Sequence, residues 1–136
     1  MVQDFELADP YKTILDSLNA DKPEKDVLAE RIFNWVQHNV KYIAYEEGIE
    51  GFQPHDPNEV VKNRFGDCKD MAVLTTTMMK QSGIDCYYAW VGTRDKCCTY
   101  NACPTPVVDN HMIAAYPVGD DFIFLDATST YVGTMN

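Results

Sequence analysis

The chain has 136 residues, of which 46% are hydrophobic and 12% aromatic, enough for one domain with its own core. Eleven basic residues against 21 acidic ones give a net charge of −10 with no basic stripe, which disfavours nucleic acids and anionic membranes as partners. No apolar run approaches 18 residues, and no basic segment precedes a short apolar one. The sequence therefore predicts neither a membrane span nor a signal peptide, and we expect a single domain over residues 1–136.

The first third of the chain predicts two helices. One covers residues 9–18, where Asp-Pro precedes apolar positions at helical spacing. A second begins near Pro23, with Asp21 as its expected N-cap, and runs to about Asn39 on an apolar stripe. Residues 40–45 then read as a short extended segment.

A loop rich in Gly and Pro is expected over residues 46–57, and a short helix follows it. Asp56, Pro57 and Glu59 stand in the order of an N-cap, a first-turn proline and a third-position acid. We expect this helix to end at Gly66.

The next helix is predicted to begin at Cys68 and to stop at Gly83. Its body, residues 71–81, is apolar or small on nearly every side, which is typical of a buried central helix. Residues 84–91 then form an aromatic-rich strand with apolar residues on both faces, as in the middle of a covered sheet. A long surface loop is expected over residues 93–109.

Two β-prone runs near the C-terminus, residues 111–116 and 121–126, flank the turn-forming residues 117–120 and predict an antiparallel hairpin. If Tyr116 pairs with Asp121, cross-strand partners sum to 116 + 121 = 237, and His111 faces Asp126 directly. Opposed residues on one face have Cβ atoms about 4.5–5.5 Å apart, close enough for a carboxylate to hold an imidazole. A shift of one residue would separate them onto opposite faces.

Cys68 supplies the third member of a candidate catalytic set. It lies at a helix start, where the partial positive charge of unpaired N–H groups favours the thiolate, and Lys69 adds a nearby cation. A lone cysteine in that position would more simply be a packed small residue. Because His111 and Asp126 follow, we interpret Cys68 as a nucleophile, His111 as its base and Asp126 as the acid that orients the base.

Residues 30–130 resemble the transglutaminase-like superfamily of papain-fold cysteine enzymes, in particular its bacterial core domains. The resemblance implies an α+β, papain-like fold whose central helix carries the nucleophile at its N-terminus, beside an antiparallel sheet of at least three strands. It places the nucleophile, base and orienting acid on the same three residues. The segments that carry it are Tyr42-Ile43-Ala44, Gly51-Phe52-Gln53-Pro54, Asn63-Arg64-Phe65-Gly66-Asp67-Cys68-Lys69-Asp70, Asn110-His111-Met112-Ile113 and Leu125-Asp126-Ala127-Thr128.

The expected activity is attack of Cys68 on a peptide or carboxamide carbonyl of a protein or peptide substrate, through a thioester. Water as acceptor gives a protease or deamidase, an amine as acceptor gives a transglutaminase, and the resemblance favours hydrolysis. Relatives often carry further domains, so additional domains in the full-length protein are expected. The alternative is a non-catalytic protein- or glycan-binding module of a larger envelope protein, against which the intact Cys, His and Asp set argues.

Two accessory features stay open. The backbone N–H of Cys68 is a first donor for an oxyanion, and Gln53 is the candidate for a second, as a glutamine is in papain-like enzymes; an exposed loop amide is the alternative. Asp67 is expected to cap the helix, and Asp70 to pair with Arg64 or Lys62.

The other four cysteines either form two disulfides in an oxidising compartment or remain free in the cytosol. The resemblance favours the first, and with it a periplasmic or secreted location. Three of the four form a single cluster without the second ligand pair typical of zinc sites, so we expect no metal and no cofactor. The four are Cys86, Cys97, Cys98 and Cys103.

Overall fold

The computed structural model describes residues 5–43, 53–91 and 111–128. In these segments the chain forms four helices, a three-stranded antiparallel sheet and a two-stranded parallel pair, an α+β fold. The elements in chain order are α1 (Asp9–Leu18), α2 (Lys25–Asn39), β1 (Lys41–Tyr42), α3 (Pro57–Asn63), β2 (Phe65–Gly66), α4 (Cys68–Gln81), β3 (Tyr87–Val91), β4 (His111–Val118) and β5 (Asp121–Leu125).

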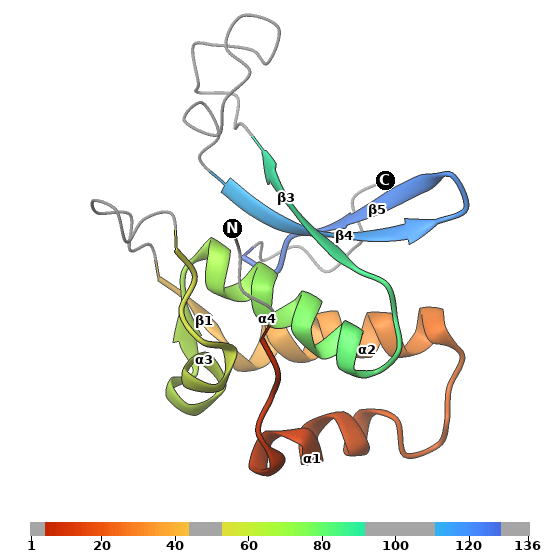
Figure 1. The fold of residues 1–136 in the computed structure, drawn as a ribbon, viewed down its shortest axis with the longest axis horizontal. Helices are drawn as coiled ribbons and strands as arrows, with labels where there is room; N and C mark the ends of the chain where they lie inside the picture. Colours follow the sequence, from red (N-terminus) through yellow and green to blue (C-terminus); the bar gives the residue numbers. More distant parts are fainter. Residues whose placement is uncertain (1–4, 44–52, 92–110, 129–136) are drawn as a thin grey trace, which may run out of the picture.

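Helix α4 is the centre of the fold, as predicted. It packs against β3 and β4 on one side and against α2 and α3 on the other, so it lies between the sheet and the remaining helices (Figure 1). All residues from Cys68 to Met79 are buried. Fully burying one Leu or Met side chain stabilises a fold by about 1.5–3 kcal/mol, so this helix is held firmly in place. Gly83 follows it with φ +76°, a conformation that glycine adopts without strain.

The hairpin forms as predicted, but the predicted register is wrong by two residues. Val118 pairs with Asp121 and Ala114 with Leu125, so partners sum to 118 + 121 = 239 rather than 237. The turn is shorter than expected because Gly119, at φ +61°, takes the first place of a two-residue turn. A shift of two keeps every side chain on its face, so Asp126 remains a diagonal neighbour of His111 instead of its direct partner.

Two predicted helix boundaries are corrected. Helix α2 begins at Lys25 rather than near Pro23, and its N-cap is Glu24 rather than Asp21. The carboxylate of Asp21 instead binds Arg31 through contacts of 2.6 and 3.0 Å. Helix α3 starts after its predicted cap, Asp56, but ends at Asn63. The following residues make a short parallel strand with β1 instead of a last helical turn.

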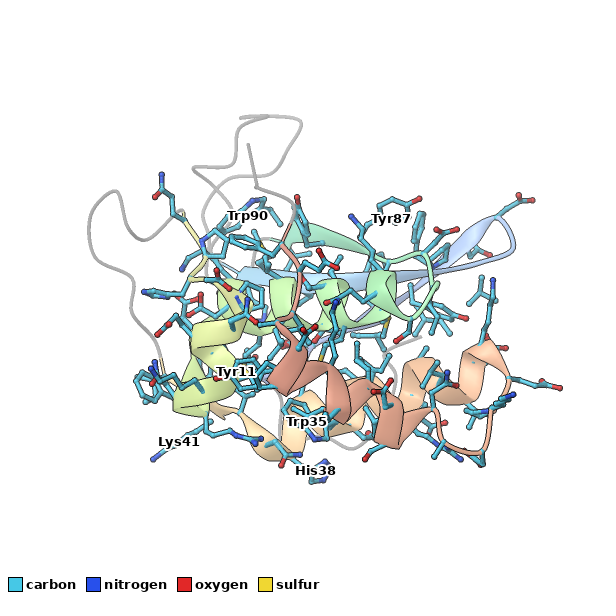
Figure 2. The ribbon with its side chains drawn as sticks, turned by 60° about the horizontal axis from the view of Figure 1, so that its bottom comes forward. Tyr11, Trp35, His38, Lys41, Tyr87 and Trp90 are labelled. Carbon is cyan, nitrogen blue, oxygen red and sulfur yellow. The ribbon has the colours of Figure 1, made fainter. Side chains whose placement is uncertain are left out.

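Arg64 causes the early end of α3. Its backbone is left-handed, at φ 63°, and its guanidinium lies 5.0 Å from the centre of the Trp35 ring. The cation–π contact contributes to holding a conformation that costs a non-glycine residue about 1–2 kcal/mol. Trp35 itself packs against the main core between the helices (Figure 2).

The strand predicted over residues 84–91 begins later and lies elsewhere in the sheet. Only Tyr87–Val91 are extended, and they form an edge, since the order of the described strands is β3-β4-β5. The middle strand is β4. Tyr87 is 52% exposed, so the β3 edge is not covered on both faces as the apolar pattern indicated.

Candidate active site

The first turn of α4 positions Cys68, the first residue of the helix. Asp67 is the N-cap, as predicted, and its carboxylate accepts from the backbone N–H of Asp70 at 3.0 Å. The carboxylate of Asp70 accepts in return from the backbone N–H of Asp67, also at 3.0 Å. This reciprocal capping box fixes the backbone N–H groups of Asp67 and Asp70, which flank Cys68 in the chain, and Cys68 itself is only 1% exposed.

The glycine before this turn is required by space. A Cβ atom placed on Gly66 would lie 2.7 Å from the Cβ of Asp70 and 3.1 Å from its Oδ2. Such an approach is shorter than real Cβ contacts, so β2 can lie against the first turn of α4 only with glycine at this position. The short strand and the nucleophile candidate are therefore held together by close backbone packing.

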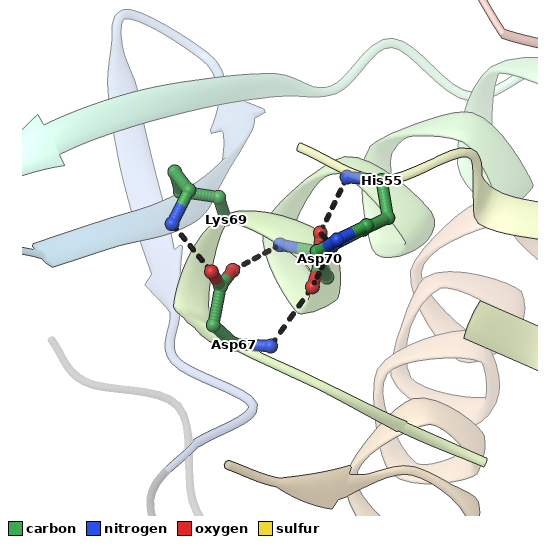
Figure 3. A network of polar contacts seen from close by, with 4 residues as sticks. All are labelled: His55, Asp67, Lys69 and Asp70. Carbon is green, nitrogen blue, oxygen red and sulfur yellow. Dashed lines mark hydrogen bonds and ion pairs between the residues drawn. The ribbon is translucent and has the colours of Figure 1, made fainter. Parts of the chain in front are cut away.

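Lys69 is buried to 1% exposure and binds the carboxylate of Asp67, which is equally buried. Figure 3 shows this ion pair on the side of α4 that faces the sheet. Sequence analysis expected Lys69 to act as a cation near the thiol. The structure pairs its charge with Asp67, so the ammonium completes the helix cap.

Asp70 binds His55 rather than Arg64 or Lys62, which corrects the expected pairing. The backbone N–H of His55 donates to Asp70 Oδ1 at 2.6 Å, and its Nδ1 lies 2.9 Å from Oδ2 (Figure 3). This contact raises the pKa of His55, chiefly through the side-chain hydrogen bond with Asp70.

His111 and Asp126 meet at the open end of the hairpin. His111 is the first residue of β4, Asp126 follows β5, and His111 Nε2 lies 2.8 Å from Asp126 Oδ2. The other carboxylate oxygen, Oδ1, accepts from the backbone N–H of Thr128 at 3.0 Å and from its hydroxyl at 2.6 Å. Asp126 is thus fixed on one side and presents its second oxygen to the imidazole.

The pKa shifts of His111 and Asp126 both favour the charged forms of the two side chains. The hydrogen bond with Asp126, and after it a hydrogen bond with Cys68, raise the pKa of His111 to about 10, although burial opposes this. Burial raises the pKa of Asp126, but the hydrogen bonds from His111 and Thr128 outweigh it and hold the pKa below its usual value. At neutral pH the imidazole is therefore protonated and the carboxylate is ionised.

Cys68, His111 and Asp126 are thereby brought together, with His111 between the other two. Cys68 packs in a small apolar cluster that is separate from the main core. The buried members are Cys68, Ala72, Val73 and Met112, and the partly buried Phe5, Tyr88 and Trp90 pack against them. This apolar wall limits the access of water to the sulfur.

The remaining site predictions have mixed outcomes. Gln53 is exposed, two residues before the contact of His55 with α4, and its role as an oxyanion donor remains a prediction. Cys86 is a buried free thiol whose pKa is raised mainly by burial. Cys86 forms no disulfide within the described residues, and the two expected disulfides remain a prediction. Cys97, Cys98, Cys103 and Asn110 lie outside the described residues.

Two residues at the site were missed by sequence analysis. Thr128 orients Asp126 through an Asp-x-Thr turn, a local pattern that the sequence does contain. His55 received no role, because no local pattern ties it to Asp70, which is 15 positions away. Within the described segments, no three His, Cys, Asp or Glu side chains converge as a metal site would require.

A cavity of about 430 Å³ lies next to this site, between α3 and the first turn of α4. His55, Asn63, Phe65 and Asp70 contribute to its walls. Neither Cys68 nor His111 is among the described residues that line it, so the cavity borders the first turn of α4 on the side away from these two residues.

In the part of the chain that the structure describes, no helix is long and apolar enough to cross a membrane.

Comparison with known proteins agrees with this arrangement. Residues 12–127 match the transglutaminase-like superfamily. A candidate protease from Parabacteroides distasonis has the same fold, with a TM-score of 0.70 and 16% identity over 90% of this chain and 23% of that chain. A candidate cysteine protease from Cytophaga hutchinsonii gives 0.65 and 20% over 94% of this chain and 40% of that chain. The chain thus spans less than half of either structure, and no curated protein matches it.

Proposed function

The chain belongs to the transglutaminase-like superfamily, and from that premise we propose that it is a cysteine enzyme that cleaves or transfers acyl groups at peptide or carboxamide bonds. The observation that carries the proposal is the 2.8 Å contact of His111 with Asp126, together with the influence of Cys68, which helps to raise the pKa of His111. A thiol at a helix start, an imidazole and an orienting carboxylate are the parts that nucleophilic acyl transfer needs. The fold and the family support a cysteine enzyme, and the finer assignment is ours.

In the proposed mechanism the proton of the Cys68 thiol resides on His111. The sulfur attacks the carbonyl carbon, and the C–O π electrons move to the oxygen. The tetrahedral intermediate then collapses, the C–N bond breaks, and His111 gives its proton to the departing amine. The high pKa of His111 suits this role, because the proton is already in place at neutral pH. The product is a thioester on Cys68 and a free amine.

The thioester is resolved by a second nucleophile. Water, deprotonated by His111, gives hydrolysis and makes the protein a protease or a deamidase. An amine gives transamidation. We favour hydrolysis of a peptide substrate, and the full-length protein is expected to contain further domains that select it.

Developing charge on the carbonyl oxygen requires hydrogen-bond donors. The backbone N–H of Cys68, at the first position of α4, makes no intrahelical bond and is the first proposed donor. Gln53 is the second. The segment that carries it is bound to the first turn of α4 through His55, and this supports its placement near the sulfur.

Alkylation rates test the nucleophile without a known substrate. Cys68 and Cys86 are both buried free thiols, at 1% and 0% exposure, but only Cys68 has an imidazole partner. We expect iodoacetamide at about pH 6.5 to modify Cys68 at least tenfold faster than Cys86, because the thiolate is the reactive form. Peptide mapping by mass spectrometry measures both rates in one sample.

His111→Gln is the matched variant for this experiment, since it should abolish the difference between the two thiols. Equal rates in the wild-type protein would contradict the proposal and favour a non-catalytic binding module. Peptide hydrolysis that survives in Cys68→Ala would also contradict it.

A further inference from the structure

Asp70 connects the loop before α3 to the residue that precedes Cys68. Its Oδ2 accepts from the backbone N–H of Asp67 at 3.0 Å and from His55 Nδ1 at 2.9 Å. Its Oδ1 accepts from the backbone N–H of His55 at 2.6 Å and lies 3.1 Å from Nδ1. One carboxylate therefore holds both an imidazole and the backbone N–H of the residue that precedes the proposed nucleophile.

The side chains of Asp70 and His55 differ sharply in burial. The side chain of Asp70 is 1% exposed, whereas that of His55 is 59% exposed and borders the 430 Å³ cavity. Packing therefore cannot be what fixes the imidazole, and its hydrogen bonds must do so. Asp70, conversely, needs these donors, because a buried carboxylate without enough partners is strongly destabilised. Losing Nδ1 should turn or displace the carboxylate and loosen its bond with the N–H of Asp67.

The direction of Nδ1 as donor is fixed by chemistry. An ionised carboxylate only accepts, so His55 Nδ1 carries the proton. The side chain of asparagine places its Nδ2 donor near the position of Nδ1, whereas glutamine places its Nε2 farther out, where the imidazole has Nε2. The two amides therefore distinguish a role for Nδ1 from a role for the exposed edge of the ring.

We propose that His55 is a positioning residue for Cys68, acting through Asp70 on the backbone N–H of Asp67, the residue that precedes Cys68. The backbone of Asp67 leads directly into the next peptide unit, which carries the Cys68 N–H, the first proposed oxyanion donor, and which sets the direction of the sulfur toward His111. The same contact holds the segment with Gln53 against the first turn of α4. The inference rests on the proposed function, because it concerns the reactivity of Cys68.

The test measures the alkylation rate of Cys68 by iodoacetamide in four variants, at a temperature well below unfolding. We expect His55→Ala to slow the reaction about tenfold, since misplacement of a reacting group by about 1 Å can cost as much as 100-fold. His55→Asn should stay within about twofold of the wild type, and His55→Gln should behave like His55→Ala. His38→Ala is the matched control, because His38 is exposed on α2 and its Nδ1 contacts the backbone oxygen of Asn34 in the same helix (Figure 2).

The outcomes separate the two proposals. Slow reaction of Cys68 in the wild-type protein itself would remove the proposed function, and this inference with it. Fast reaction in the wild type and equally fast reaction in His55→Ala would overturn the positioning role alone. Equal loss in the Asn and Gln variants, or faster reaction in His55→Ala, would also overturn it. If His55→Ala does not fold, the comparison of Asn with Gln decides the question.

Discussion

Both carboxylate oxygens of Asp126 are occupied, and this determines what the residue can do for His111. Thr128 takes Oδ1 with two donors, so Oδ2 is left facing His111 Nε2. With Nε2 bound to the carboxylate, Nδ1 is the ring nitrogen left for the thiol. The geometry holds the imidazole in one orientation and favours its protonated form.

Asp126→Asn should lower the pKa of His111 from about 10, because the hydrogen bond with Asp126 is its largest cause. We also expect the proposed activity to fall by about 10²–10⁴, since an amide no longer stabilises the imidazolium. NMR titration of the His111 ring protons measures the pKa independently of activity. Asp121→Asn, an exposed change at the start of β5, the strand that Asp126 follows, serves as control. An unchanged titration of His111 would refute the role given to Asp126.

The residues of the site were predictable to the extent that their signals are local. Cys68 and its cap lie in one short motif, and strand alternation was enough to bring His111 and Asp126 to the same face. The cross-strand register was not predictable, because the length of the turn sets it and the hairpin closes at Gly119, two residues later than expected. The contact of His55 with Asp70 is set by how α3 packs on α4, which no short motif encodes.

The first turn of α4 contains an ion pair with both charges buried. Lys69 Nζ lies 2.5 Å from Asp67 Oδ2, and each side chain is 1% exposed. Asp67 also receives the Asp70 N–H, so its charge is partly compensated without the lysine. Removing Lys69 should nevertheless destabilise the fold, because the carboxylate of Asp67 would stay buried beside the sheet.

Lys69→Met should therefore lower the free energy of unfolding by about 3–5 kcal/mol, although its volume fits. Urea denaturation measures this loss. Lys12→Met is the control, since Lys12 makes only exposed contacts of 3.5 and 3.7 Å with Glu6 and Asp9, and its replacement should change stability little. A small loss in Lys69→Met would mean that Asp67 is sufficiently solvated by the helix end.

At the level of elements, the interior of each helix was more predictable than its ends. The apolar pattern located α4 and its burial, and Asp56 marked the start of α3. The end of α3 depends on Arg64, which adopts a left-handed conformation beside Trp35, a residue from a different helix. Likewise Tyr87–Val91 is apolar on both faces, but pairing with β4 alone made it an edge among the described strands.

For the whole molecule, the shifted pKa of His111 makes stability depend on pH. His111 binds its proton more tightly in the folded protein, at a pKa of about 10, than in the unfolded chain, where about 6.5 is usual. Its contribution is therefore complete below about pH 6.5 and is lost as the pH rises through 10. Asp126, whose pKa is lowered, contributes above about pH 3.8 and loses its contribution in acid.

Urea unfolding of the wild type and of His111→Gln at about pH 6, 8 and 10 tests this linkage. The difference in unfolding free energy should be largest at pH 6 and should shrink steadily toward pH 10. His38→Gln, on the exposed side of α2, should show no such trend. A difference that is constant with pH would show that the pKa of His111 is the same in the folded and the unfolded protein, and so would contradict the raised pKa.

The lack of space for a Cβ at Gly66 has a consequence for how this motif can change in evolution. The limiting contact joins a Cβ on residue 66 to the Cβ of residue 70, not to the carboxylate. Every residue except glycine has a Cβ, so no replacement of Asp70 other than glycine would make room at position 66. Substitution of Asp70 by a residue other than glycine therefore leaves the requirement for glycine at position 66 unchanged. Among divergent relatives, we expect the glycine at position 66 to be retained more often than the acid at position 70.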